Sequence, residues 1–282
     1  MTARGILERG LASFGIPADE ASLDAMLRYA ELLDMGNHVM NLTAITAPED
    51  VARLHFLDAA ALLGAADFRA ARVVDVGTGA GFPGVPLRIL MPDMRLTLLD
   101  SLGKRVEFLR GACREMGWPV RAEEAPEGEE PVRARSGPQV KIPLSGQALP
   151  ADRKTARSAG AAGGAVRCVN ARAEEFARFP GERDGYDIAV SRAVADLRVL
   201  LELCLPLVRP GGLFLAMKAA GCGDELNAAG RAVTLLGGRL RPLFEYRIPE
   251  TDILRCIVAV EKIGPTPEKY PRRFAKIQKA PL

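Results

Sequence analysis

The spacing of apolar residues divides the chain into a helical first part and an alternating second part. Apolar positions between Ile6 and Phe14, and again between Leu23 and Leu33, recur at helical spacing and predict helices within residues 1–35. The polar segment 36–45 (GNHVMNLTAI) predicts a turn. Pro48 and the two acidic residues after it are typical of the first turn of another helix. We therefore interpret residues 1–66 as an N-terminal helical extension.

From residue 72 onward, short apolar runs alternate with helical patterns. The helical patterns cover residues 86–91, 104–117 and a long segment ending at Leu205. The runs that predict strands are 72–77, 95–100, 166–170, 186–193, 211–220 and 248–263. This alternation predicts an α/β domain over residues 67–282, built on a doubly wound, mostly parallel sheet.

One segment, residues 121–165, interrupts the alternation. It begins with clustered glutamates and continues with Pro, Gly, Ser and Ala, with almost no periodic apolar content. Such a segment cannot bury enough apolar surface to offset its ordering entropy, so we interpret it as a largely disordered insertion. The alternative is a loop that contacts RNA through its cations, Arg133, Arg135, Lys141, Arg153, Lys154 and Arg157.

The strongest motif is VVDVGTGAGFPG, residues 73–84, in which a predicted strand leads into Gly77, Gly79 and Gly81. Glycines let the backbone turn sharply and approach a ligand closely, and in open α/β sheets ligands bind where the strands end. The spacing is G-x-G-x-G, and Phe82 stands where a dinucleotide fingerprint continues towards its third glycine. A nucleoside with an amino-acid tail fits this loop better than a pyrophosphate; the alternative is a tight turn without a ligand.

Two aspartates accompany this loop. Asp100 ends the next predicted strand, where a carboxylate can accept hydrogen bonds from both ribose hydroxyls; the alternative is an N-cap for the following helix. Asp75 lies inside the loop's strand, where burial requires a partner. It could order loop amides, meet the ammonium group of the cofactor, or be purely structural.

Three further segments end predicted strands or begin helices near the same edge. Ala173 and Glu174, in NARAEEF, could present backbone groups to an adenine, although an exposed helix start is the better explanation from the residues alone. Arg192 could fix a phosphate or line the base pocket, or instead pair with Asp187 or Asp196. Lys218 could contact a phosphate, or be a surface lysine whose stem lies along the protein.

Composition and charge exclude several classes of protein. The net charge is +3, which permits an RNA partner without arguing for one. With two histidines and five scattered cysteines, we predict reduced thiols and no metal site. No apolar run is long enough for a membrane helix, so we expect a cytoplasmic protein that does not bind membranes. The end of the chain is basic and a candidate phosphate patch, with Lys262, Lys269, Arg272, Arg273, Lys276 and Lys279. A frayed, solvated terminus is the alternative.

Several of these segments together resemble one family, RsmG (glucose-inhibited division protein B), the 16S ribosomal RNA guanine-N7 methyltransferases. The resemblance covers residues 5–120 and 166–275. It is carried by NLTAI, HFLDA, VVDVGTGAGFPGVPL, LTLLDSLGKRVEFL, ARAEEF, VSRA and EKIGPTPEKYPRR. It implies a Rossmann-like class I methyltransferase that binds S-adenosylmethionine and acts on 16S ribosomal RNA or the 30S subunit, at a guanine in a stem-loop of the decoding region. Apart from the resemblance, we expect a monomer.

The resemblance also implies roles for individual residues. It matches the cofactor loop to Gly77 and Phe82, the acidic residue to Asp100, and the adenosine contact to Ala173 and Glu174. Arg192 matches the family's SRA arginine, and we predict it to be both cofactor-binding and catalytic. The sequence departs from the family at GNHVMNLT, where Gly36 and His38 replace the usual aromatic residue and lysine.

Three other functions stay open at this point. The same fold could methylate a small molecule or a protein, and fold alone does not decide between these substrates. A nucleotide-binding oxidoreductase is disfavoured by the glycine spacing, and a catalytically silent RNA-binding module by the intact loop with Asp100.

Overall fold

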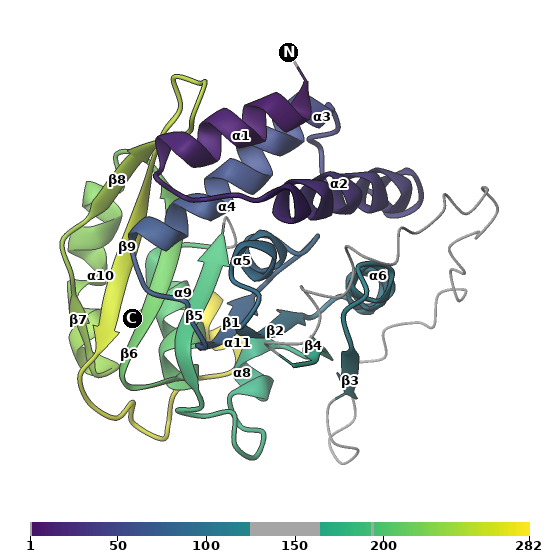
Figure 1. The fold of residues 1–282 in the computed structure, drawn as a ribbon. Helices are drawn as coiled ribbons and strands as arrows, with labels where there is room; N and C mark the ends of the chain where they lie inside the picture. The colour runs from purple at the N-terminus through teal and green to yellow at the C-terminus, as the bar shows by residue number, and fades with distance from the viewer. Residues whose placement is uncertain (1, 125–163, 193–194) are drawn as a thin grey trace.

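The computed structural model describes residues 2–124, 164–192 and 195–282, and within them a nine-stranded sheet forms the centre of the molecule (Figure 1). The strand order is β3-β4-β2-β1-β5-β6-β9-β7, with β8 paired to β9. Neighbours from β3 to β6 are parallel, whereas β9 runs antiparallel to β6, β7 and β8. The strands are β1 (Arg72–Val76), β2 (Arg95–Asp100), β3 (Val120–Glu124), β4 (Val166–Asn170), β5 (Tyr186–Arg192), β6 (Val208–Ala219), β7 (Gly238–Leu240), β8 (Phe244–Arg247) and β9 (Leu254–Lys262).

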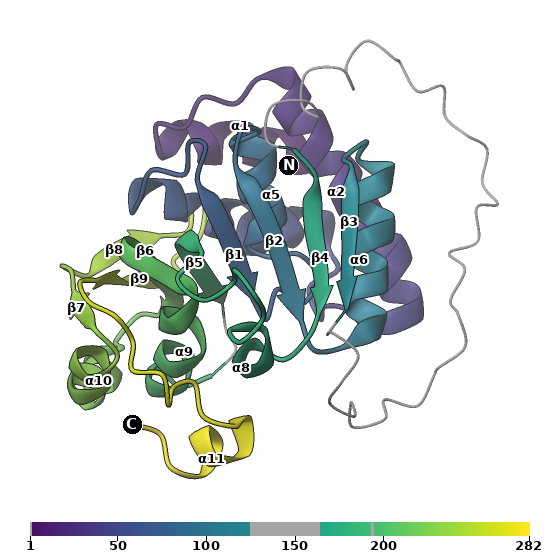
Figure 2. The same ribbon diagram turned by 90° about the horizontal axis from the view of Figure 1, so that it is seen from below.

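Helices cover both faces of this sheet, which confirms the predicted doubly wound α/β class (Figures 1 and 2). One face carries α1 (Ala3–Ser13), α2 (Glu20–Met40), α3 (Pro48–Val51), the π-helix η1 (Ala52–Leu57), α4 (Asp58–Ala60), the 3₁₀-helix η2 (Ala61–Gly64), α5 (Gly84–Leu90) and α6 (Gly103–Glu115). The other carries α8 (Ala173–Phe176), α9 (Leu197–Cys204), the 3₁₀-helix η3 (Leu205–Leu207), α10 (Gly223–Leu235) and α11 (Phe274–Lys279).

Two hydrophobic layers result because successive strand residues point to opposite faces. In β1, Val73 belongs to the core beneath the N-terminal helices, and Val74 belongs to the core beneath α9. Both are fully buried, as expected of a central parallel strand covered on both sides. The helices of residues 1–66 therefore form, together with α5 and α6, one of the two layers that cover the sheet.

The turn predicted at residues 36–45 is wrong over its first half, because α2 continues to Met40. Gly36 and Met40 are both buried and lie four residues apart, so the polar residues between them form the outer face of a helix. A Cβ at Gly36 would lie 2.5 Å from the Phe108 ring of α6, which leaves no space for a larger residue. The helix ends at Asn41, whose left-handed backbone (φ 49°) starts the turn.

Three differences from the predicted strands concern the edges of the sheet. Residues 121–124, predicted to begin the insertion, belong to β3, an edge strand that pairs with β4. Charged residues are tolerated at a sheet edge, which explains why the glutamates there do not break the strand. The rest of the predicted insertion, with its cations, lies outside the described residues except for Gly164 and Ala165. The predicted last strand is confirmed in its second half as β9, and the short strands β7 and β8 have no clear pattern in the sequence.

Among the described residues, no helix is both long enough and apolar enough to cross a membrane.

Candidate active site

The glycine loop leaves β1 where the strand ends, between β2 and β5 (Figure 2). Gly77, Gly79 and Gly81 all have positive φ (71°, 58° and 87°), a conformation that residues with a Cβ rarely adopt. The loop is held from below by the Leu99 carbonyl of β2, which accepts hydrogen bonds from the amides of Gly77 and Thr78. A Cβ at Gly79 would meet nothing within 4 Å, so the loop faces open space there. The geometry thus keeps one side of the loop accessible to a ligand.

Asp75 orders the return of this loop into α5. Its Oδ2 accepts hydrogen bonds from the Thr78 hydroxyl at 2.7 Å and from the Gly84 amide at 2.8 Å. Its Oδ1 is buried and has no hydrogen-bond partner within the described residues. Burial raises the pKa of this carboxyl to about 6, although the two hydrogen bonds and Arg192 oppose the shift. A buried carboxylate oxygen without a partner is costly, and a cationic group beside the loop would stabilise its charged form.

Asp100 ends β2 and is buried beside the loop. Its Oδ2 accepts from the Gly79 amide at 3.0 Å, and its Oδ1 accepts from the Leu102 amide at 2.9 Å. The predicted alternative, an N-cap of α6, is wrong in detail, because the N-cap position is Leu102 and has no side-chain cap. A carboxylate can accept about four hydrogen bonds, so Asp100 keeps capacity for a ligand's hydroxyls.

Helix α2 of the N-terminal extension packs against the glycine loop. The Tyr29 hydroxyl donates to the Ala80 carbonyl at 2.8 Å and is fully buried. A Cβ at Gly81 would lie 2.3 Å from that hydroxyl, so only glycine fits beneath it. The ring of Phe82 is edge-on to both Tyr29 and Phe56, with ring centroids 5.9 and 5.6 Å away. The glycine loop is therefore packed against α2 and η1, two helices of the N-terminal extension.

Arg192 ends β5 and reaches the π-helix η1 rather than either of its predicted partners. Its Nη1 donates to the Leu54 carbonyl at 3.1 Å and to Asp58 Oδ2 at 3.2 Å, and its Nη2 lies 3.0 Å from His55 Nδ1. Its guanidinium also lies 5.2 Å from the centre of the Phe82 ring. The alternative, an ion pair of Arg192 with Asp187 or Asp196, is wrong, because Asp187 pairs with Arg209 and Asp196 pairs with Arg198.

His55 contacts Arg192, Phe82 and Thr43. Its ring stacks on Phe82 with centroids 4.5 Å apart, and its Nε2 lies 3.0 Å from the Thr43 hydroxyl. Burial, and secondly the neighbouring Arg192 charge, lower the pKa of His55 to about 3. The imidazole is therefore neutral at physiological pH.

These side chains and the glycine loop enclose a cavity of about 150 Å³. Of the predicted site residues, Gly77, Gly79, Phe82 and Arg192 line it; its full lining is Leu42, Thr43, His55, Gly77, Thr78, Gly79, Ala80, Phe82 and Arg192. Gly81 and Asp100 lie just behind it, in contact with the loop. The cavity is smaller than a nucleoside cofactor, so it matches one end of such a molecule.

Ala173 and Glu174 begin the short helix α8, after β4 has paired with β2 at Asp100. They thus follow the strand that pairs with β2 at Asp100, and they do not line the cavity. The predicted alternative of an exposed helix start is wrong for Glu174, which is buried. Burial raises the pKa of this carboxyl, while a backbone hydrogen bond from Phe274 in α11 opposes the shift.

Three other residues predicted as phosphate contacts make their hydrogen bonds inside the protein. Lys218 donates to the Ala195 carbonyl at 2.7 Å and to Glu225 Oε1 at 2.6 Å, so it is neither a surface lysine nor an open cation. In the tail, Lys262 is fully buried against Asp184 and the Leu205 carbonyl. Arg272 makes a bidentate pair with Glu202 of α9. The exposed cations of the tail are Lys269, Arg273, Lys276 and Lys279.

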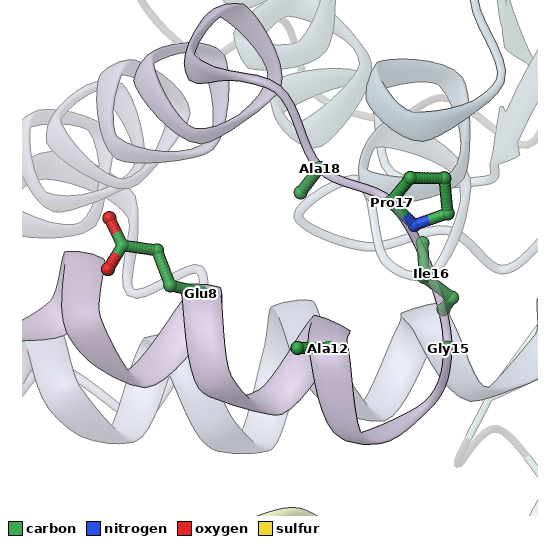
Figure 3. Close-up of a pocket in the computed structure, with 6 residues that line it drawn as sticks. All are labelled: Glu8, Ala12, Gly15, Ile16, Pro17 and Ala18. Atoms are coloured by element: carbon green, nitrogen blue, oxygen red, sulfur yellow. The ribbon is translucent and has the colours of Figure 1, made fainter.

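A second hollow, of about 550 Å³, lies between α1 and the segment that leads into α2 (Figure 3). Its lining is apolar apart from Glu8, and it shares no residue with the cavity at the glycine loop. No group of three or more metal-ligating side chains occurs among residues 2–124, 164–192 and 195–282.

Sequence reasoning assigned no role to Thr43, His55, Asp58 or Tyr246. Tyr246 of β8 donates to Asp58 Oδ1 at 2.7 Å and so completes the support of Arg192. The first three belong to NLTAI and HFLDA, segments that carried the family resemblance. The family resemblance was therefore the one signal for Thr43, His55 and Asp58, because their spacing in the sequence does not place them at the glycine loop.

Comparisons with known proteins identify the family of this chain. A family profile described as rRNA small subunit methyltransferase G matches residues 22–129 and 162–248. A protein from Symbiobacterium thermophilum named "Ribosomal RNA small subunit methyltransferase G" is 42% identical over 280 residues, which cover 99% of this chain and 98% of that protein. A protein of the same name from Alkaliphilus metalliredigens is 35% identical over 283 residues, the full length of both.

Among solved structures, TrmN from Thermus thermophilus is 18% identical with a TM-score of 0.44, covering 73% of this chain and 48% of that one, a likeness too weak to inform the site. The family profile and the full-length relatives, in contrast, span the glycine loop and the helices that close over it. The chain belongs to the rRNA small subunit methyltransferase G family.

Proposed function

We propose that this chain transfers the methyl group of S-adenosylmethionine to N7 of a guanine in the decoding-region stem-loop of 16S ribosomal RNA. The observation that carries the proposal is the cavity where the glycine loop meets His55 and Arg192, in a chain whose full-length relatives are named as small-subunit ribosomal RNA methyltransferases. We expect the enzyme to act as a monomer in the cytoplasm, on either the free RNA or the assembled 30S subunit.

Residues around the glycine loop fit S-adenosylmethionine. Asp100 would accept the ribose hydroxyls, and the start of α8, at Ala173 and Glu174, would meet the adenine edge from the next strand. Gly79, which faces open space, would let the amino-acid tail approach the backbone. The partnerless Oδ1 of Asp75 suits a site that receives a cation, because an ammonium or sulfonium charge nearby favours the ionised carboxylate.

Methyl transfer to N7 of guanine requires the protein mainly to position the base and the cofactor. The cofactor supplies an activated methyl group on a sulfonium. N7 of guanine is an acceptor without a proton, so no general base is required. His55, with its lowered pKa, stays neutral near pH 7 and does not serve as an acid or a base there, and it is held between Phe82, Arg192 and Thr43. These residues would exclude water and align the base edge with the methyl carbon, and alignment alone can supply much of a rate enhancement.

The cavity also limits how the RNA can bind. A space of about 150 Å³ admits the edge of a single base and no paired helix, so the target guanine has to leave its stack. The exposed cations Lys269, Arg273, Lys276 and Lys279 are available to hold phosphates outside the cavity.

The test is to incubate the purified protein with labelled S-adenosylmethionine and small ribosomal subunits that lack the modification, and then to map any 7-methylguanine by cleavage at that base. We expect label at a single guanine. Asp100→Ala should lose cofactor binding and label together, while His38→Ala, at an exposed position on α2, should behave as wild type. Cofactor binding without label would instead favour a small-molecule or protein substrate, and binding of NAD would favour an oxidoreductase.

A further inference from the structure

The hydrogen bonds around His55 fix which of its nitrogens carries the proton. The Arg192 guanidinium can only donate, so His55 Nδ1, 3.0 Å from Nη2, has to accept. A protonated imidazole would place an N–H against that donor, and the imidazole is therefore neutral. Its single N–H is on Nε2 and points to the Thr43 hydroxyl oxygen at 3.0 Å.

The same hydroxyl receives a second hydrogen bond. The amide of Ile45 donates to Thr43 Oγ1 at 3.1 Å, in the turn that follows Asn41. A hydroxyl oxygen has two lone pairs, and both are occupied here, one by His55 and one by Ile45. The Thr43 hydroxyl can therefore act only as a donor. Because Thr43 lines the cavity, its proton is available to whatever enters.

A site that offers a donor and no acceptor selects among base edges. Guanine presents two acceptors side by side, N7 and O6, whereas adenine presents N7 beside an amino group that donates. A donor-only hydroxyl would bond O6 of guanine and would leave the adenine amino group facing another donor. Sites with buried polar groups reject analogues that leave those groups unpaired.

We propose that the Thr43 hydroxyl donates to O6 of the target guanine and so selects guanine over adenine, in a donor state set by Arg192 through His55. This inference rests on the proposed function, since it requires a purine whose N7 is methylated. In this scheme Thr43 contacts the substrate, whereas His55 and Arg192 are positioning residues.

The support behind Thr43 is stiff enough to hold such a donor in place. His55 is stacked on Phe82, and Arg192 is fixed by Asp58, which in turn accepts from Tyr246. The Thr43 amide also donates to Asn37 Oδ1 at 2.8 Å, which ties the turn to the end of α2. A donor held from several sides does not have to reorganise when the base arrives.

The experiment combines one protein change with one base change. Ribosomal RNA is joined from synthetic and transcribed segments so that the target position carries guanine or 2-aminopurine, which keeps N7 and has hydrogen in place of O6. The RNA is assembled into small subunits, and kcat/KM for methyl transfer is measured for wild type, Thr43→Val and Thr43→Ser. Valine keeps the shape of threonine without the hydroxyl, and serine keeps the hydroxyl.

We expect Thr43→Val to lower kcat/KM on guanine by about tenfold and on 2-aminopurine by less than about twofold, the loss typical of one well-placed hydrogen bond. The preference of the wild type for guanine over 2-aminopurine should thus fall by about tenfold, and Thr43→Ser should retain it. An equal loss on both RNAs would mean that Thr43 is only structural and would overturn the inference while the proposed function stands. A wild type that methylates neither RNA would overturn both.

Discussion

The neutral state of His55 predicts an unusual dependence of stability on pH. The pKa of His55 is about 3 in the folded protein, compared with the ordinary value of 6.5. Below pH 6.5, His55 is therefore protonated in the unfolded chain but stays neutral in the folded protein. The free energy of unfolding falls as pH falls towards 3. Between pH 7 and pH 4.5 this single group should cost roughly 2.5 kcal/mol of unfolding free energy.

The perturbation that isolates this effect is His55→Asn, which removes the titrating group but keeps an acceptor for Arg192. Unfolding in urea is followed at pH 7 and pH 4.5 by the fluorescence of Trp118, the one tryptophan of the chain, and by circular dichroism, which have to coincide for a two-state treatment. The stability of the wild type relative to the variant should fall by roughly 2.5 kcal/mol at the lower pH. A difference that is the same at both pH values would refute a neutral, buried His55.

Asp75 provides an internal control of opposite sign. Its pKa is raised to about 6 from 3.8, so the folded protein binds a proton more readily than the unfolded chain as pH falls below 6. Stability from this group rises by about 2 kcal/mol between pH 7 and pH 4.5. The two effects nearly cancel in the wild type. We therefore expect the His55→Asn variant, which keeps Asp75, to become more stable between pH 7 and pH 4.5. The Asp75→Asn variant, which keeps His55, should become less stable over the same range.

Three further predictions concern the loop and the tail. Gly81→Ala would push a Cβ into the Tyr29 hydroxyl at a positive φ, and calorimetry should show a loss of at least ~1 kcal/mol together with weaker cofactor binding; unchanged binding would contradict the packing. Asp100→Asn should weaken S-adenosylmethionine binding about tenfold by titration calorimetry, with its thermal stability as the control. Glu202→Gln should destabilise the fold by about 3 kcal/mol, because Arg272 loses a buried partner, and adding Arg272→Met should restore part of that loss.

The parts of the site that the sequence could predict are those built from local spacing. Gly77, Gly79 and Asp100 were recognised because a glycine turn and a carboxylate at a strand end have the same chemistry in any doubly wound sheet. The strand order, in contrast, depends on crossovers between distant segments. The short antiparallel strands β7 and β8 have too few residues to show a period of two.

The partners of charged residues could not be predicted for the same physical reason. The alternative that the sequence left open for Arg192 was an ion pair with a nearby aspartate, but Arg192 at the end of β5 pairs with Asp58, far away in the chain. Lys262 and Arg272 read as solvated cations because composition does not reveal that Asp184 and Glu202 meet them inside the protein. Only the tertiary fold decides which charges are buried together.

The two parts of the chain on either side of residue 66 therefore do not have separate functions. The cavity takes its glycine loop and Arg192 from the sheet, and it takes Thr43 and His55 from the helical extension. The π-helix η1 is where the two regions join, since its wide turn directs the Leu54 carbonyl and the His55 ring to the same guanidinium. π-turns often occur at functional sites because they re-aim side chains at a cost to the regular helix. A glycine loop that binds a cofactor is common to many folds, whereas the donor that we propose to contact the base, Thr43, comes from the helical extension. In that proposal, base selection and cofactor binding depend on the same contacts around Arg192.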